Sequence, residues 1–206
     1  MWSLTAAAAN HDAFTIEALP ANCQRFCKSV AKNDFYNRTR LMNVAATSEP
    51  DTFRMNVPPD NAGGTRVYSV GNNTPIIKGV NIEADDLIVK GVPIDSLNLP
   101  LNRPVVMKID VEGHELQALY GAINFLKEAN VVYAMMELRT NLHSDKRWKE
   151  IFDILSSKGL KPFRLNYEDE TELDVERLRE WKHFKHPIVK YYDVAWRLDD
   201  FVSGAK

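Results

Sequence analysis

The residues best suited to chemistry lie in one stretch of the chain, residues 105–122. An apolar run rich in β-branched side chains ends at Asp110, and further acidic residues follow on both sides of Gly113. A near-continuous apolar run is typical of a strand that is covered on both faces. Asp110 is therefore predicted at the carboxyl end of a strand, the edge at which open α/β sheets bind their ligands. We expect its carboxylate to contact a ligand, and Gly113 to allow a positive φ in the turn that follows.

Other polar residues of this stretch are open to two interpretations. Glu112 and Glu115 lie near the start of a helix predicted at 114–128, where the macrodipole favours negative charge by about 0.3–1 kcal/mol, so their role could be structural alone. Glu112 and His114 are nevertheless further candidates for catalysis. Lys108 is interpreted as a strand-edge residue whose ammonium reaches solvent, and not as a catalytic group.

The elements that position these residues follow an alternating pattern, which favours an α/β fold with a largely parallel sheet. A core-facing stripe supports the helix at 145–157, because Trp148, Ile151, Phe152 and Leu155 are spaced i, i+3, i+4 and i+7. The polar stretch after residue 172 is also predicted to be helical. The other predicted helices are 3–9, 20–33 and 114–128, and the predicted strands are 13–17, 41–46, 131–138, 161–165 and 191–198.

Residues 47–104 interrupt this alternation. Prolines and glycines separate short β-prone runs at 52–57, 66–70 and 87–92. We interpret the segment as an antiparallel insertion or an extended pair of loops within a single domain that spans residues 1–206. Its position before the strand that ends at Asp110 would let it overhang the ligand-binding edge.

Composition excludes some classes of function. The 206 residues include 26 Lys and Arg against 28 Asp and Glu, a net charge of −2, so nucleic acid is not an expected partner. No apolar stretch approaches the ~20 residues of a membrane span, and no secretory leader is visible, so a cytoplasmic location is expected.

The sequence does not predict a metal site. Cys23 and Cys27 share a helical face without a second ligand pair for zinc, which predicts buried thiols. Asp85 and Asp86 are interpreted as solvated acids, and no metal site is predicted.

The run Lys108-Ile109-Asp110-Val111-Glu112-Gly113-His114-Glu115 resembles the signature K-I-D-V-E-G-x-E of the FkbM family of methyltransferases. The resemblance implies a class I methyltransferase fold, which is Rossmann-like, with a mostly parallel sheet and helices on both faces. It also implies S-adenosylmethionine as the cofactor. The expected reaction is transfer of a methyl group to a hydroxyl of a small molecule or glycan.

Further motifs extend the resemblance over roughly residues 3–138. The run 14–22 is similar to the family run A-F-E-P-x-P-x-N, which implies that Glu17 binds the ribose of the cofactor. Asn43-Val44-Ala45-Ala46 resembles a family segment near the adenine, 93–97 resembles a run L-D-S-L, and Glu137 matches an acid at the end of the fifth strand. The resemblance thus implies cofactor contacts at Glu17, Asn43, Ala45 and Asp110, and catalytic candidates at Asp110, Glu112, His114 and Glu137.

One family feature does not occur in the sequence. Family members open with a strand and a glycine loop of the type D-V-G-A-N-x-G, whereas this chain contains no G-x-G. The resemblance therefore implies an N-terminally truncated fold in which the strands before Glu17 and Asp110 lack a common neighbour. We expect residues 1–206 alone to bind S-adenosylmethionine weakly.

Two other functions stay open. The first is a catalytically inactive, truncated methyltransferase-like domain that binds a partner protein. The second is a NAD-dependent dehydrogenase, which the sequence favours less because the dinucleotide-binding glycine fingerprint is missing as well.

Overall fold

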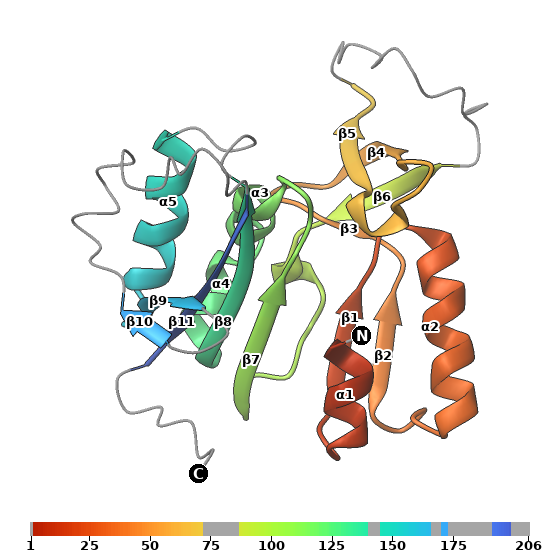
Figure 1. The fold of residues 1–206 in the computed structure, drawn as a ribbon, viewed down its shortest axis with the longest axis horizontal. Helices are drawn as coiled ribbons and strands as arrows, with labels where there is room; N and C mark the ends of the chain where they lie inside the picture. Colours follow the sequence, from red (N-terminus) through yellow and green to blue (C-terminus); the bar gives the residue numbers. More distant parts are fainter. Residues whose placement is uncertain (1, 72–86, 140–144, 166–169, 173–190, 199–206) are drawn as a thin grey trace. The chain divides into compact units, whose positions relative to one another are not determined.

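The computed structural model describes residues 2–71, 87–139, 145–165, 170–172 and 191–198 (Figure 1). The chain divides into two compact units, unit 1 (Met1–Val92) and unit 2 (Pro93–Lys206), and each is described by itself. The single domain stays a prediction. Within the described residues, no helix combines the length and the hydropathy that crossing a membrane would need.

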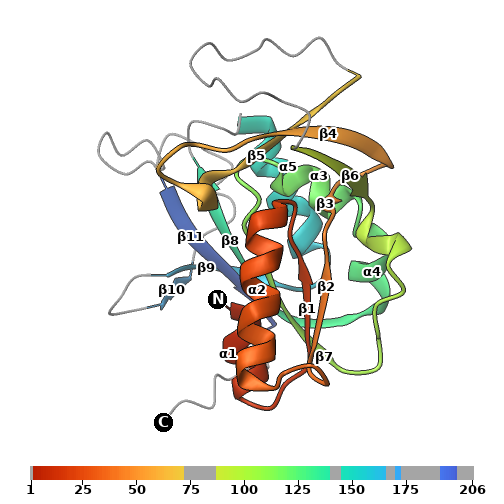
Figure 2. The same ribbon diagram turned by 90° about the vertical axis from the view of Figure 1, so that its right-hand side faces the viewer.

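Unit 1 begins with a parallel strand pair and two helices. The elements are α1 (Trp2–Ala8), β1 (Ala13–Ile16), α2 (Pro20–Asn33) and β2 (Thr39–Met42), which confirms the predicted order. Pro20 suits the first turn of α2 because its missing N–H has no partner there. The strands β1 and β2 pair in parallel, and α1 and α2 lie on the same side of the pair (Figure 2).

The second sheet of unit 1 contains the three β-prone runs predicted within residues 47–104, although the insertion itself stays a prediction. It contains β3 (Ala45–Ala46), β4 (Asp51–Asn56), β5 (Arg66–Ser69) and β6 (Ile88–Val92), in the spatial order β3-β6-β4-β5. The strand β4 pairs antiparallel with β5 and β6, whereas β3 and β6 are parallel. A short 3-10 helix, η1 (Ala62–Gly64), connects β4 and β5.

The strand predicted at 41–46 is wrong as a single element. The chain instead forms β2 and β3, which belong to different sheets. The break falls at Asn43, whose side-chain amide donates to the carbonyl oxygens of Glu17 and Ala18 at 2.9 and 2.8 Å. These bonds tie the end of β2 to the loop after β1. The next strand therefore starts in a new direction.

The described residues of unit 2 form one five-stranded sheet and three α-helices. Its elements are η3 (Ile94–Ser96), β7 (Pro104–Ile109), α3 (Glu115–Tyr120), α4 (Ile123–Glu128), β8 (Asn130–Arg139), α5 (Asp145–Ser156), β9 (Lys161–Leu165), β10 (Glu170–Glu172) and β11 (Tyr191–Arg197). The predicted stripe of α5 is buried, and the ring of Phe152 lies 5.2 Å from that of Trp196 on β11. The helix predicted after residue 172 lies outside the described residues.

The described sheets are mixed, so the prediction of a mostly parallel sheet is not confirmed. The strand order in unit 2 is β10-β9-β11-β8-β7, and only β7 and β8 are parallel. The physical reason lies in the connections. The α3–α4 segment joins β7 to β8 and allows a parallel crossover, whereas the few residues between β9 and β10 allow only an antiparallel turn.

The strands that precede Glu17 and Asp110, β1 and β7, are both edge strands among the described residues. Within unit 1, β1 pairs only with β2, and within unit 2, β7 pairs only with β8. Parallel strands are normally covered and paired on both sides. On β7, the side chain of Val106 is accordingly 66% exposed. The missing strand stays a prediction, because every open sheet has edge strands.

The helix predicted at 114–128 is also wrong as a single element, because the chain breaks into α3 and α4 at Gly121. The carboxylate of Asp95 accepts hydrogen bonds from the backbone N–H groups of Asn124 and Phe125 at 3.0 and 2.7 Å. The backbone N–H of Asp95 donates to the carbonyl of Gly121 at 2.8 Å. Asp95 thus supplies the partners that the first turn of α4 lacks.

Replacing Asp95 with Ala should lower the free energy of unfolding by about 1–2 kcal/mol, the usual cost of losing a capping side chain. Chemical denaturation measures the change. Glu128→Ala, an exposed acid at the other end of α4, is the matched control and should stay within about 0.5 kcal/mol of the parent chain. Equal stability of the two variants would contradict the capping role of Asp95.

Candidate active site

The candidate active site of unit 2 lies at the carboxyl end of β7 and β8. Ile109, the last residue of β7, is in register with Met136. Asp110 and Glu137 are therefore the next residues on two neighbouring parallel strands, and their side chains meet at the same edge of the sheet. One carboxylate oxygen from each of Asp110, Glu112 and Glu137 lies within 4.8 Å of the other two. We call these three residues the carboxylate cluster.

The loop after β7 brings Glu112 into this cluster through an unusual backbone. Glu112 has a φ of +55° and Gly113 a φ of +99°, which confirms the positive φ predicted for the glycine. Glu115 is almost completely buried, and its Oε1 accepts a hydrogen bond from the backbone N–H of Gly113 at 3.0 Å. A non-glycine residue at positive φ is strained. The buried Glu115 therefore supports the loop conformation.

Lys108 contacts the cluster, which the sequence analysis did not foresee. Its Nζ lies 2.5 Å from Oδ2 of Asp110. The two residues are two positions apart on an extended segment, so their side chains point to the same face. This i, i+2 spacing was the available signal. The interpretation of Lys108 as a strand-edge residue agrees with the place of β7 at the end of the described sheet, and its ammonium contacts Asp110.

His114 is not part of the group that the structure brings together among the described residues. It lies at the N-terminal boundary of α3, and its backbone N–H donates to the carbonyl of Val111 at 3.3 Å. Three of the four predicted catalytic residues thus lie together, and His114 stays a candidate only.

Asp193 adds an acid that the sequence analysis missed. It lies on β11 directly opposite Glu137 in the antiparallel pair of β11 and β8. Directly opposed residues of an antiparallel pair share a face of the sheet. Asp193 therefore extends the acidic face onto a third strand. Only the pairing of distant strands could reveal this neighbour.

In unit 1, Glu17 follows β1 at the carboxyl end of a parallel pair. Its Oε1 accepts a hydrogen bond from the backbone N–H of Leu19 at 2.8 Å. Its Oε2 has a contact of 3.4 Å with the side-chain amide of Asn22, which is long for a hydrogen bond. One carboxylate oxygen thus supports the turn into α2, while the other can accept stronger hydrogen bonds from a ligand.

The two other predicted cofactor contacts of unit 1 differ from each other. The side chain of Asn43 is exposed, although its amide nitrogen is already used for the carbonyls of the β1 loop. Ala45 is buried in the core cluster with Leu19, Phe53, Met55 and Val89. Its methyl group therefore packs inside unit 1, and only its backbone could face a ligand.

The family model described as the methyltransferase FkbM domain matches residues 2–162 of the chain. The chain belongs to the FkbM methyltransferase family. No curated protein and no solved structure matches it. The match confirms the resemblance, and it includes the carboxylate cluster and Glu17. Asp193 lies beyond the matched residues.

Two further predictions concern thiols and metals in this FkbM family member. Cys23 is buried, and burial together with the nearby charge of Glu17 raises the pKa of its thiol to about 11, so it is not a nucleophile at neutral pH. Cys27 is exposed, so the prediction of two buried thiols is half wrong.

The carboxylate cluster has oxygens of the kind that divalent cations prefer. The absence of a metal stays a prediction, and Asp85 and Asp86 lie outside the described residues.

Proposed function

We propose that the chain functions as an S-adenosylmethionine-dependent O-methyltransferase, or as the major part of one, that methylates a hydroxyl of a small molecule or glycan. The observation that carries this proposal is the carboxylate cluster after β7 in a chain of a methyltransferase family. A hydroxyl oxygen must lose its proton when it accepts a methyl group, and a carboxylate within hydrogen-bond reach can accept that proton.

The residues of unit 1 fit the ribose part of the proposed cofactor. Ribose hydroxyls are donors, and Oε2 of Glu17 is an acceptor with one long contact among the described residues. Charge-assisted hydrogen bonds to a carboxylate are the stronger kind. When bound, S-adenosylmethionine supplies the methyl group as an electrophile.

The residues of unit 2 fit the hydroxyl acceptor. Asp110, with its charge offset by Lys108, is suited to accept a hydrogen bond from the acceptor and to orient it. Glu137 and Glu112, within 4.8 Å, are suited to take up the proton. Orientation of the reacting oxygen contributes much of the rate in such transfers.

A binding and turnover experiment tests this function. Calorimetry would measure S-adenosylmethionine binding, and mass spectrometry would measure S-adenosylhomocysteine formed with a panel of sugars, phenols and aliphatic alcohols. Both measurements are made on the chain itself and on a chain extended before Met1 by a strand and a glycine loop of the family type. Binding with product from at least one hydroxyl compound supports the proposal. If neither chain binds the cofactor, the proposal fails and the inactive binding module is favoured.

Replacing Glu17 with Ala should weaken S-adenosylmethionine binding about 10- to 100-fold, because one charge-assisted hydrogen bond contributes roughly 1.5–3 kcal/mol. The measurement is calorimetry on whichever of the two chains binds. Glu17→Gln keeps an acceptor for the backbone N–H of Leu19 but removes the charge, so its affinity should lie between those of Glu17→Ala and the parent. Glu49→Ala, an exposed acid of the same unit, is the control. Unchanged affinity in Glu17→Ala would rule out the ribose assignment.

A further inference from the structure

The contact between Lys108 and Asp110 is partly shielded from water. The side chain of Lys108 is 24% exposed and that of Asp110 is 40% exposed, and their charged atoms are 2.5 Å apart. Partly buried pairs are screened less than pairs on an open surface. The ammonium therefore restrains the Asp110 carboxylate more firmly than a flexible surface pair would.

The surroundings of Asp110 explain why a cation belongs there. Its carboxylate lies within 4.8 Å of those of Glu112 and Glu137. Like charges at this separation repel one another, so the three carboxylates tend to move apart. A cation on one member of the group lowers that repulsion. An ammonium also has three N–H donors, and an oxygen that accepts one of them is held in a defined orientation.

We propose that Lys108 is a positioning residue that serves as the built-in cation of the carboxylate cluster. It holds the Asp110 carboxylate in place and occupies the side of Oδ2 that a divalent cation would otherwise take. This inference rests on the proposed function, in which Asp110 binds the acceptor, because it assigns to Lys108 the orientation of the Asp110 carboxylate.

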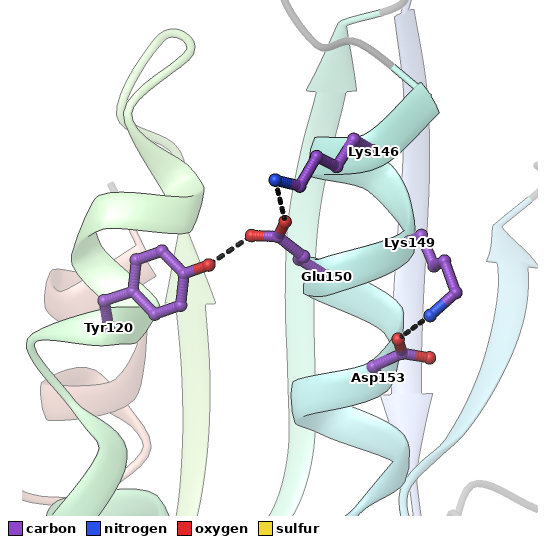
Figure 3. Close-up of polar contacts among 5 residues, drawn as sticks. All are labelled: Tyr120, Lys146, Lys149, Glu150 and Asp153. Carbon is purple, nitrogen blue, oxygen red and sulfur yellow. Dashed lines mark hydrogen bonds and ion pairs between the residues drawn. The ribbon is translucent and has the colours of Figure 1, made fainter.

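A second Lys–Asp pair of unit 2 provides a matched control. Lys149 and Asp153 lie one turn apart on α5, and their charged atoms are also 2.5 Å apart (Figure 3). The side chain of Lys149 is 56% exposed, and Asp153 is not a member of the carboxylate cluster. Removing Lys149 thus removes a lysine from a similar ion pair without exposing the cluster.

The test is a titration with Mn²⁺ alone, followed by electron paramagnetic resonance, on the parent chain and on Lys108→Met, Lys108→Arg and Lys149→Met. Lys108→Met should bind Mn²⁺ at least tenfold more tightly than the parent. Lys108→Arg retains the positive charge, and Lys149→Met leaves the cluster intact, so both should stay within twofold of the parent. The measurement needs neither cofactor nor acceptor, so its outcome is independent of whether the chain transfers methyl groups.

Further variants make each outcome decisive. The double variant Lys108→Met with Asp110→Asn should lose the gained affinity, and a gain that persists would overturn the proposal because the ion would then bind elsewhere. Equal Mn²⁺ affinity of Lys108→Met and the parent would also overturn it. Circular dichroism checks folding, and Lys108→Gln replaces Lys108→Met if the latter does not fold.

A kinetic measurement tests the positioning role once an acceptor is identified. Lys108→Met should lower kcat more than it changes KM, and Lys108→Arg should restore most of the loss. An unchanged kcat would overturn the positioning role and leave the proposed function intact.

Discussion

Replacing Asp110 with Asn should lower the rate of methyl transfer about 100-fold, because poor orientation of a reacting group can cost that much. The change preserves the size and polarity of the side chain but removes the charge that contacts Lys108 and that we propose to orient the acceptor. Because the Asp110 side chain is 40% exposed, folding should change little. Product formation is measured beside a thermal melt of each variant.

The matched control for Asp110→Asn is Asp153→Asn, which changes an equally exposed carboxylate that also pairs with a lysine. It should leave the rate of methyl transfer unchanged. If Asp110→Asn unfolds early while its folded fraction keeps the parent's specific activity, the residue supports the fold and not the reaction.

Replacing Trp196 with Ala should lower the free energy of unfolding by about 3–5 kcal/mol, the usual cost of truncating a buried aromatic side chain. Trp196 lies on β11 and has no exposed surface, and its ring packs against Phe152 of α5. Its removal would leave a cavity where α5 meets the sheet. Chemical denaturation followed by circular dichroism measures the loss.

Two control variants, Trp2→Ala and Trp196→Phe, accompany Trp196→Ala. Trp2→Ala changes a tryptophan that is 60% exposed and should cost less than about 0.5 kcal/mol. Trp196→Phe keeps an aromatic ring in place, and it removes an indole N–H that has no hydrogen-bond partner among the described residues. It should therefore retain most of the stability. A loss below about 1 kcal/mol in Trp196→Ala would show that the contact between α5 and β11 does not stabilise unit 2.

The cofactor experiment also tests the expectation that a strand and a glycine loop are missing. The glycine loop of the family lies beside the methionine part of the cofactor, and this sequence contains no G-x-G. Weak binding by residues 1–206 and strong binding by the extended chain would support the expectation drawn from the sequence. Tight binding by the unextended chain would show that another segment performs the role of the loop.

The sequence by itself determined the features that depend on residues close together in the chain. The apolar run before Asp110 predicted β7, and Gly113 predicted the positive φ of the turn. The spacing of apolar residues predicted the buried face of α5. Each of these depends on local periodicity or on the backbone freedom of one residue, which a short window of sequence contains. The eight-residue signature likewise indicated the family.

Tertiary structure alone decided which distant residues meet. Asp193 became a neighbour of Glu137 because β11 inserts between β8 and β9, a pairing that no local pattern specifies. The helix predicted at 114–128 broke at Gly121 because Asp95, 29 residues before Asn124, caps the second half. The mixed sheet arose in the same way, since strand direction follows from the connections and from the partners available at each edge. Hydrogen bonds and charges act through space, so their partners are known only once the chain has folded.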